Sequence, residues 1–164
     1  MLKAIKIRLY PNIEQTNYIN NLLGCSRFVY NNILAYRIDE YKINNKSISF
    51  GEQGKKLVEL KSEFKWLKDV HSKVLQQSII DLNKAYNSFF KNGSGFPKFK
   101  SKHNHYYSYK TNFTNNNIKV DFENNRVQLP KLKWIKCKLH REFKGKILFA
   151  TISKVPSGKY YVSF

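Results

Sequence analysis

Acidic residues are scarce in this sequence. Only 11 Asp and Glu stand against 30 Lys and Arg in 164 residues, which gives a formal net charge of +19. Hydrophobic residues still make up 41% of the chain, which argues against a disordered basic tail and predicts a folded domain. A folded and strongly cationic protein indicates a polyanionic partner, and nucleic acid is the first candidate.

Long apolar segments are also missing. The sequence contains neither a signal peptide nor an apolar run of about 18 residues, the length that a membrane-spanning helix requires. The competing interpretation, binding to an anionic membrane, needs a hydrophobic anchor beside a basic amphipathic helix. We therefore expect no membrane partner and a soluble protein located in the cytoplasm.

Cysteine occurs only twice, at Cys25 and Cys137. The two positions are too far apart for the spacing of a metal site, and the sequence has no Cys-x-x-Cys pair. Each thiol is therefore expected to act as a small buried hydrophobe. We expect no metal and no cofactor in this chain.

Clustered carboxylates are absent from the sequence as well. Asp39–Glu40 and the pair Asp121 and Glu123 are the only close groups among the 11 acids. Metal-dependent phosphodiester cleavage needs carboxylates gathered around its cations. No phosphate-binding glycine loop and no Ser/His/Asp arrangement is present either. We expect this chain to bind its target without cutting it.

His103 and His105 form a His-x-His pair, which is the metal-binding pattern of single-strand nicking transposases. Such pairs usually lie on a buried strand with an apolar residue between them, and they need a third ligand. Here Asn104 separates the histidines and Lys102 precedes them. We favour two histidines that face solvent or phosphate, and the letters HNH alone do not define a nuclease.

The chain opens with a strand pattern followed by a helix pattern. Residues 3–10 alternate apolar and polar side chains, which is typical of a strand. Asn12 and Gln15 have the spacing of a capping box that opens a long helix. Gly24 is a position where that helix can bend or divide.

Two further helices are expected before residue 94. Ser49 and Glu52 form a second capping box, which predicts a short helix. From about Ser72 the apolar residues recur at helical intervals, and Gly93 is a natural stop. The sequence therefore predicts helices inserted after the first strand.

The second half of the chain changes character after Phe113. Five short segments are rich in β-branched and aromatic residues and are separated by turn residues. These segments are residues 116–122, 125–130, 134–140, 146–154 and 158–164. With the first strand they predict an α+β fold, a small β-barrel of six strands with an all-helical insertion after the first strand.

Residues 93–113 interleave aromatic and basic side chains. The aromatic members are Phe96, Phe99, Tyr106, Tyr107 and Tyr109, and the lysines are Lys98, Lys100, Lys102 and Lys110. Lysines neutralise phosphates and aromatic faces stack on unpaired bases, so this pattern suits a surface that follows a nucleic-acid strand. The alternative is that Phe96 and Phe99, which flank Pro97, anchor a loop to the core while the lysines stay exposed.

Several segments together resemble the N-terminal part of the TnpB (OrfB) family. These proteins are encoded in bacterial insertion sequences and are similar to type V CRISPR effectors. The resemblance covers residues 3–164 in register. It is carried by the segments KIRLYPNIEQ, GCSRFVYNNILAYR, LQQSIIDLNKAYNSFF, GFPKFKSK, TNFTNNN, VQLPKLKWIK and GKILFATISKVPSGKYYVSF.

The resemblance implies a domain plan. It assigns residues 1–10 and 105–164 to a β-barrel wedge domain and residues 11–104 to a helical recognition lobe, helix-turn-helix-like. In the family a RuvC-like nuclease with Mg²⁺ and a zinc ribbon with structural zinc follow these parts. We expect the chain to be the front part of a longer protein, with the nuclease supplied in cis or in trans. A bacterial or archaeal, nucleoid-associated location is implied as well.

The resemblance also implies guide RNA and double-stranded DNA as partners, with a short duplex motif read beside the target. The matching motif-reading positions are Phe50, Ser72, Gln76, Thr114 and Asn115. Relatives can carry Tyr or Lys at the first two of these positions, so the motif itself is not given by the sequence. A Gln on a helix can bind adenine through two hydrogen bonds in a major groove, and the alternative for Gln76 is a solvated polar face.

A second set of residues is expected to contact the nucleic-acid backbone or to stack on bases. It contains Lys6, Arg8, Arg27, Lys73, Lys98, Lys100, Lys102, Tyr106, Tyr107, Tyr109 and Lys110. Two other functions remain open at this point. One is a stand-alone helix-turn-helix repressor of DNA, and the other is the single-strand nicking transposase.

Overall fold

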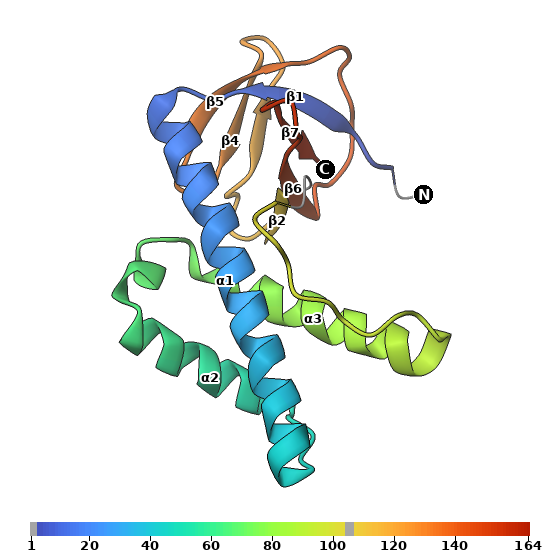
Figure 1. Cartoon of the computed structure of the whole chain (residues 1–164). Helices are drawn as coiled ribbons and strands as arrows, with labels where there is room; N and C mark the ends of the chain where they lie inside the picture. Colours follow the sequence, from blue (N-terminus) through green and yellow to red (C-terminus); the bar gives the residue numbers. More distant parts are fainter. Residues whose placement is uncertain (1–2, 104–106) are drawn as a thin grey trace. The chain divides into compact units, whose positions relative to one another are not determined.

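The computed structural model describes residues 3–103 and 107–164. Three α-helices and a short 3₁₀-helix follow the first strand, and six strands complete the chain (Figure 1). The first part holds β1 (Lys6–Tyr10), α1 (Ile13–Asn44), α2 (Phe50–Glu63), η1 (Lys65–Lys68) and α3 (Ser72–Asn92). The second holds β2 (Tyr107–Asn112), β3 (Lys119–Asp121), β4 (Arg126–Leu129), β5 (Lys133–Lys138), β6 (Phe149–Lys154) and β7 (Tyr160–Ser163).

The chain divides into two compact units. The sheet unit combines residues 1–23 with residues 104–164, and the helical unit consists of residues 24–103. The division falls inside α1, at Gly24. Gly24 does not interrupt α1, which is helical from Ile13 to Asn44.

The sheet unit is one antiparallel sheet in the order β2-β6-β7-β1-β5-β4-β3. The strand from the start of the chain lies at its centre, between β5 and the last strand β7, as the blue and red ribbons of Figure 1 show. The α+β class and the helical insertion are confirmed. The barrel is wrong, because β2 and β3 lie at opposite edges of the sheet and do not pair with each other. The edge strand β3 has only three residues, which leaves little backbone for closure.

A seventh strand, β2, was missed by the sequence analysis. It lies in the aromatic and basic stretch, yet it alternates as a strand should, with Tyr109 and Thr111 buried. Lys110 and Ser108 point to the other face. Because lysine and tyrosine alternate with other polar residues here, the two-residue period of a strand was not recognised in the sequence.

The buried face of the sheet is filled by alternate residues of the central strands. Its members are Ile7, Leu9, Val127, Leu129, Ile135, Cys137, Ala150, Ile152, Tyr160 and Val162. Gln15 ties the first turn of α1 to this unit, since its Nε2 donates to the carbonyls of Leu132 (2.9 Å) and Trp134 (3.0 Å). The capping box of Asn12 and Gln15 is confirmed, because each backbone N–H is accepted by the other side chain at 3.0 and 2.8 Å.

Helix α2 begins, and helix α3 begins and ends, where the sequence predicted. Ser49 and Glu52 form the capping box of α2. Gly93 adopts a left-handed conformation (φ 65°) as the C-cap of α3, which glycine does without a Cβ clash. A partly buried network of polar side chains then links the helices: Asn83 Nδ2 donates to Gln53 Oε1 (2.9 Å), and Asn83 Oδ1 accepts from Arg37 (3.1 Å). This network fixes α2 and α3 against the second half of α1.

Both cysteines are free and buried, as predicted. Burial raises the pKa of Cys25 to about 11, with a smaller contribution from Asp69, and burial raises the pKa of Cys137 to about 11. Both thiols are therefore neutral at pH 7 and act as small packing groups. Across residues 3–103 and 107–164, no helix has the length and apolar character needed to cross a membrane.

Candidate nucleic-acid interface

The outer face of the sheet is cationic. Side chains directly opposite each other in an antiparallel sheet point to the same face, and the register places Arg8 opposite both Lys138 and Tyr161. Tyr10 lies opposite Lys136 in the same way. A second row runs from Lys6 through Ser163 and Thr151 to Lys110. We call Lys6, Arg8, Lys110, Lys136 and Lys138 the cationic face.

Aromatic rings lie between these cations. The Nζ of Lys6 is 4.5 Å from the centre of the Tyr161 ring, and Cζ of Arg8 is 5.0 Å from that of Tyr10. The Nζ of Lys110 is 3.6 Å from the centre of the Phe149 ring. Cation–π contacts hold the cations near the surface and leave their charge uncompensated by any anion.

Acidic side chains are nearly missing from this sheet. Asp121 on β3 is the single acid in the seven strands as described, and its carboxylate binds Nε of Arg126 at 2.7 Å. Hydrogen bonds from Asn124 and then from Arg126 lower the pKa of Asp121 to about 2. Asp121 is therefore charged at neutral pH and already paired, which leaves the five members of the cationic face to an external anion.

Arg8 carries an additional sign of a missing partner. Its Nε is buried and has no hydrogen-bond acceptor among the described residues. Buried donors without an acceptor cost about 1–3 kcal/mol and call for an explanation. A guanidinium held between Tyr10 and Tyr161 and short of acceptors suits contact with a phosphate or a base edge.

Three of the five motif-reading candidates lie in the helical unit. Ser72 and Gln76 are one turn apart on the exposed face of α3, with Lys73 beside them. The Nζ of Lys61 donates a hydrogen bond to Oγ of Ser72, which adds a cation to this surface. Phe50 is the first residue of α2 and is 57% exposed.

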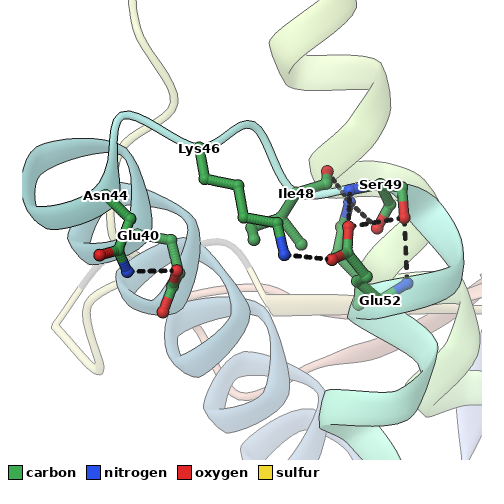
Figure 2. A network of polar contacts seen from close by, with 7 residues as sticks. Glu40, Asn44, Lys46, Ile48, Ser49 and Glu52 are labelled. Atoms are coloured by element: carbon green, nitrogen blue, oxygen red, sulfur yellow. Dashed lines mark hydrogen bonds and ion pairs between the residues drawn. The ribbon is translucent and has the colours of Figure 1, made fainter.

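The start of α2 is held by a polar network of Lys46, Ser49 and Glu52 (Figure 2). Glu52 accepts hydrogen bonds from both the backbone N–H (2.9 Å) and the hydroxyl (2.8 Å) of Ser49, and it binds Nζ of Lys46 at 2.6 Å. The contact with Lys46 and then those with Ser49 lower the pKa of Glu52 to about 2. The network fixes the backbone from which Phe50 projects.

The other two motif-reading candidates lie in the sheet unit, in the turn between β2 and β3. The backbone N–H of Thr114 donates to Oδ1 of Asn117 at 2.8 Å. Asn115 and Asn116 adopt positive φ angles of 51° and 58°, which Asn tolerates better than most residues. Asn115 is exposed, whereas Thr114 is half-buried.

The lysines of residues 98–102 are placed differently from one another. Lys98 and Lys102 are exposed. Lys100 is tied into the helical unit, because the Asn31 side chain binds both of its backbone groups and its Nζ lies 4.2 Å from the centre of the Tyr30 ring. Arg27 on α1 is half-buried. Pro97 is the buried member of this segment, rather than Phe96 or Phe99.

The tyrosines of the basic stretch do not share one environment. Tyr109 is only 5% exposed, and burial raises its pKa. Its ring faces the core, so we remove Tyr109 from the candidates for base stacking. Tyr107 is half-buried at the start of β2. Tyr106 and His105 lie outside the described residues.

Several residues of this surface were not found from the sequence. Lys136, Lys138, Tyr10 and Tyr161 join Lys6 and Arg8 only through strand register. The alternation of KWIKCK, with Ile135 and Cys137 buried, was the available signal. His103 is exposed, and within residues 3–103 and 107–164 no group of three or more His, Cys, Asp or Glu is placed to hold a metal ion.

The fold and this surface define an α+β protein with a cationic sheet face and an inserted helical unit. A family profile described as a helix-turn-helix domain, HTH_OrfB_IS605, matches residues 1–46. In the structure this match covers β1 and α1 and ends within the loop that leads to α2.

Three relatives extend the match. “Putative RNA-guided DNA endonuclease InsQ” of Escherichia coli (strain K12) is 37% identical over 165 residues, which is 99% of this chain and 40% of that protein. “Virulence protein VsdF” of Salmonella dublin is 33% identical over 114 residues, or 63% of this chain and 96% of that protein. “Putative RNA-guided DNA endonuclease” of Streptomyces pristinaespiralis is 33% identical over 102 residues, 61% of this chain and 25% of that protein.

The chain belongs to the TnpB/OrfB family of insertion-sequence proteins. It spans 40% of the length of the E. coli relative and 25% of the Streptomyces relative. The match to the E. coli protein covers both the sheet unit and the helical unit.

Proposed function

We propose that this chain is the nucleic-acid-binding N-terminal region of a TnpB-like RNA-guided DNA endonuclease. It binds the guide RNA scaffold and a duplex motif beside the target, and it does not cut by itself. The wedge domain is formed by residues 1–10 and 105–164, and the recognition lobe by residues 11–104. Mg²⁺ and structural zinc belong to the nuclease part of the family.

The observation that carries this proposal is the cationic face of the sheet. Five cations lie on one surface in three rows of register, and the single acid of the described strands is already paired with Arg126. Like charges that face each other repel, so a surface of this kind is stabilised by a polyanion. The net charge of +19 and the relatives named for RNA-guided cleavage of DNA support a nucleic-acid partner.

The test is the salt dependence of binding. The affinity of this chain for a 20-base-pair DNA duplex and for a structured RNA hairpin is measured between about 50 and 200 mM salt. Each phosphate neutralised contributes about 0.9 to the slope of log K against log[salt] for duplex DNA. We expect a slope of several units for both ligands, and a near-flat response would contradict the proposal.

Variants connect this slope to the cationic face. Arg8→Ala and Lys138→Ala should each lower the slope by about one unit and weaken all nucleic acids alike. Lys55→Ala, an exposed lysine on α2, is the matched control and should leave the RNA slope unchanged. If Lys55→Ala lowers the slope as much as Arg8→Ala, the salt dependence comes from the net charge of the whole chain rather than from the cationic face.

The helix-turn-helix profile keeps a DNA repressor as the second candidate. A repressor would bind a palindromic duplex tightly without RNA and would not bind the RNA hairpin. A nicking transposase would cleave single strands in Mn²⁺, and His103→Ala would abolish that cleavage. We expect neither result, and a nucleoid-associated, cytoplasmic location follows from the proposal.

A further inference from the structure

An aromatic cluster lies at the C-terminal end of α3. Tyr86, Phe89 and Phe90 belong to the helix, and Phe96 lies on the segment that runs back along it (Figure 1). The Phe96 ring is 5.5 Å from Tyr86 and 5.3 Å from Phe89, edge-on in both cases. Phe90 is 5.0 Å from Phe89 and 6.2 Å from Tyr86, nearly parallel to the Tyr86 ring. We call these four residues the aromatic platform.

The platform has a buried base and an exposed top. Tyr86 is buried and Phe89 half-buried, whereas Phe90 is 72% exposed and Phe96 is 45% exposed. Gly93 makes the arrangement possible, because its left-handed conformation turns the chain back toward α3. Two large rings are thus held in fixed positions and still face solvent.

The surroundings of the platform are basic. No acid occurs in the sequence from Leu82 to Val120, while Lys84, Lys91 and Lys98 are exposed on α3 and on the returning segment. The guanidinium of Arg37 lies 3.6 Å from the centre of the Tyr86 ring. Asp81, the nearest preceding acid on α3, accepts a hydrogen bond from Gln77 at 2.9 Å. An apolar surface with a basic border favours a partner that offers both rings and negative charge.

We propose that Phe90 and Phe96 form a stacking site for unpaired bases of single-stranded RNA. The exposed ring faces take the bases, and the lysines around them take the phosphates. The inference rests on the proposed function, and it adds a site in the helical unit, where the sequence analysis assigned Phe96 no settled role and Phe90 none. Base stacking tolerates every sequence, so the site would hold an RNA segment without reading it.

The test compares two RNA probes that differ only in unpaired bases. One probe is a blunt RNA hairpin, and the other is the same hairpin with a tail of ten unpaired adenines. The chain should bind the tailed hairpin about tenfold more tightly than the blunt one. Phe90→Ala should remove most of this difference, and Phe90→Tyr, which keeps the ring, should retain it.

The controls separate stacking from folding and from charge. Ile43→Ala removes another exposed apolar side chain, 79% exposed near the end of α1, and should leave the tail-dependent gain intact. Phe90→Trp gives a fluorescence reading of the site, because stacking of a base on the indole quenches its emission. Quenching by the tailed probe, and none by the blunt one, is the expected result.

Three results would overturn the inference. A tail-dependent gain that survives Phe90→Ala shows that the bases stack elsewhere. If the unaltered chain binds the tailed and blunt hairpins equally tightly, and both with the expected salt dependence, there is no stacking site. The proposed function is not affected by that result. Dimers that dissociate on Phe90→Ala in sedimentation velocity would assign the platform to a second copy of the chain.

Discussion

The side chain of Asn31 binds both backbone groups of Lys100. Its Nδ2 donates to the Lys100 carbonyl at 2.9 Å, and its Oδ1 accepts from the Lys100 N–H at 2.8 Å. An amide side chain that bonds to both the N–H and the C=O of one residue takes the place of a hydrogen-bonded partner residue in an antiparallel sheet. The contact joins positions 69 residues apart in the sequence and anchors the lysine-bearing segment 98–102 to α1.

Removing this anchor should loosen the segment without unfolding the unit. Asn31→Ala deletes two hydrogen bonds that are partly open to solvent, each contributing about 0.5–1.5 kcal/mol at most. We expect the Lys100 amide to exchange its hydrogen at least tenfold faster in native-state exchange.

Asn32→Ala is the matched control for Asn31→Ala. The Asn32 side chain donates to the carbonyl of Phe28 within α1 and ties no distant segment. Unchanged protection of the Lys100 amide in Asn31→Ala, or equal acceleration in both variants, would contradict the anchoring role.

Gln76 should affect base preference more than stability. It is exposed on α3, so Gln76→Ala should leave the free energy of unfolding nearly unchanged. With guide RNA present, Gln76→Ala and Thr114→Ala should each weaken binding to the preferred duplex by about 1–3 kcal/mol and relax the base preference. A randomised duplex library measures both effects at once.

Asn87→Ala controls for the loss of an exposed polar group on the same helix. Lys98→Ala gives the opposite behaviour, with all sequences weakened alike. Equal losses on preferred and scrambled duplexes in the Gln76 variant would assign this residue to the backbone or to the fold.

The cap of α2 should be sensitive to acid. The Lys46 and Ser49 contacts lower the pKa of Glu52 from 4.5 to about 2. A lowered pKa in the folded state means that the cap contributes stability above pH 4.5 and loses it as the pH falls toward 2. The Tm difference between the unaltered chain and Glu52→Gln should therefore be largest at pH 7. It should shrink toward zero as the pH falls from about 4.5 to 2.

Glu63→Gln removes the same charge at the last residue of α2, away from the cap. It should not reproduce the pH-dependent difference seen for Glu52→Gln. A Glu52→Gln difference that stays constant from pH 7 to pH 2 would show that packing, rather than the carboxylate, holds the start of α2.

Local signals in the sequence were sufficient for the helix ends. Asn12, Ser49 and Gly93 act through residues within one turn, so spacing alone identifies them. Whether the sheet is open or closed could not be predicted in this way. Closure depends on pairing between β2 and β3, and the sequences of these two strands do not indicate which strands they pair with.

The candidate interface was predictable only in part, for the same reason. Lys6 and Arg8 stand out in a short alternating strand, but Lys138 reaches them through pairing between β1 and β5. Tyr109 shows the reverse error. The lysines near it in the sequence suggested an exposed ring, but the alternation of β2 directs its side chain into the core.

The central position of β1 has a consequence for how the protein is made. This strand is synthesised before the helices of residues 24–103, while its two neighbours in the sheet, β5 and β7, are synthesised after them. Until β5 has been synthesised, Ile7 and Leu9 have no neighbouring sheet strand to pair with, although the helices of residues 24–103 are already complete. The helical unit should therefore fold before the sheet is complete, and the sheet should assemble around β1 only after β5 and β7 have been synthesised.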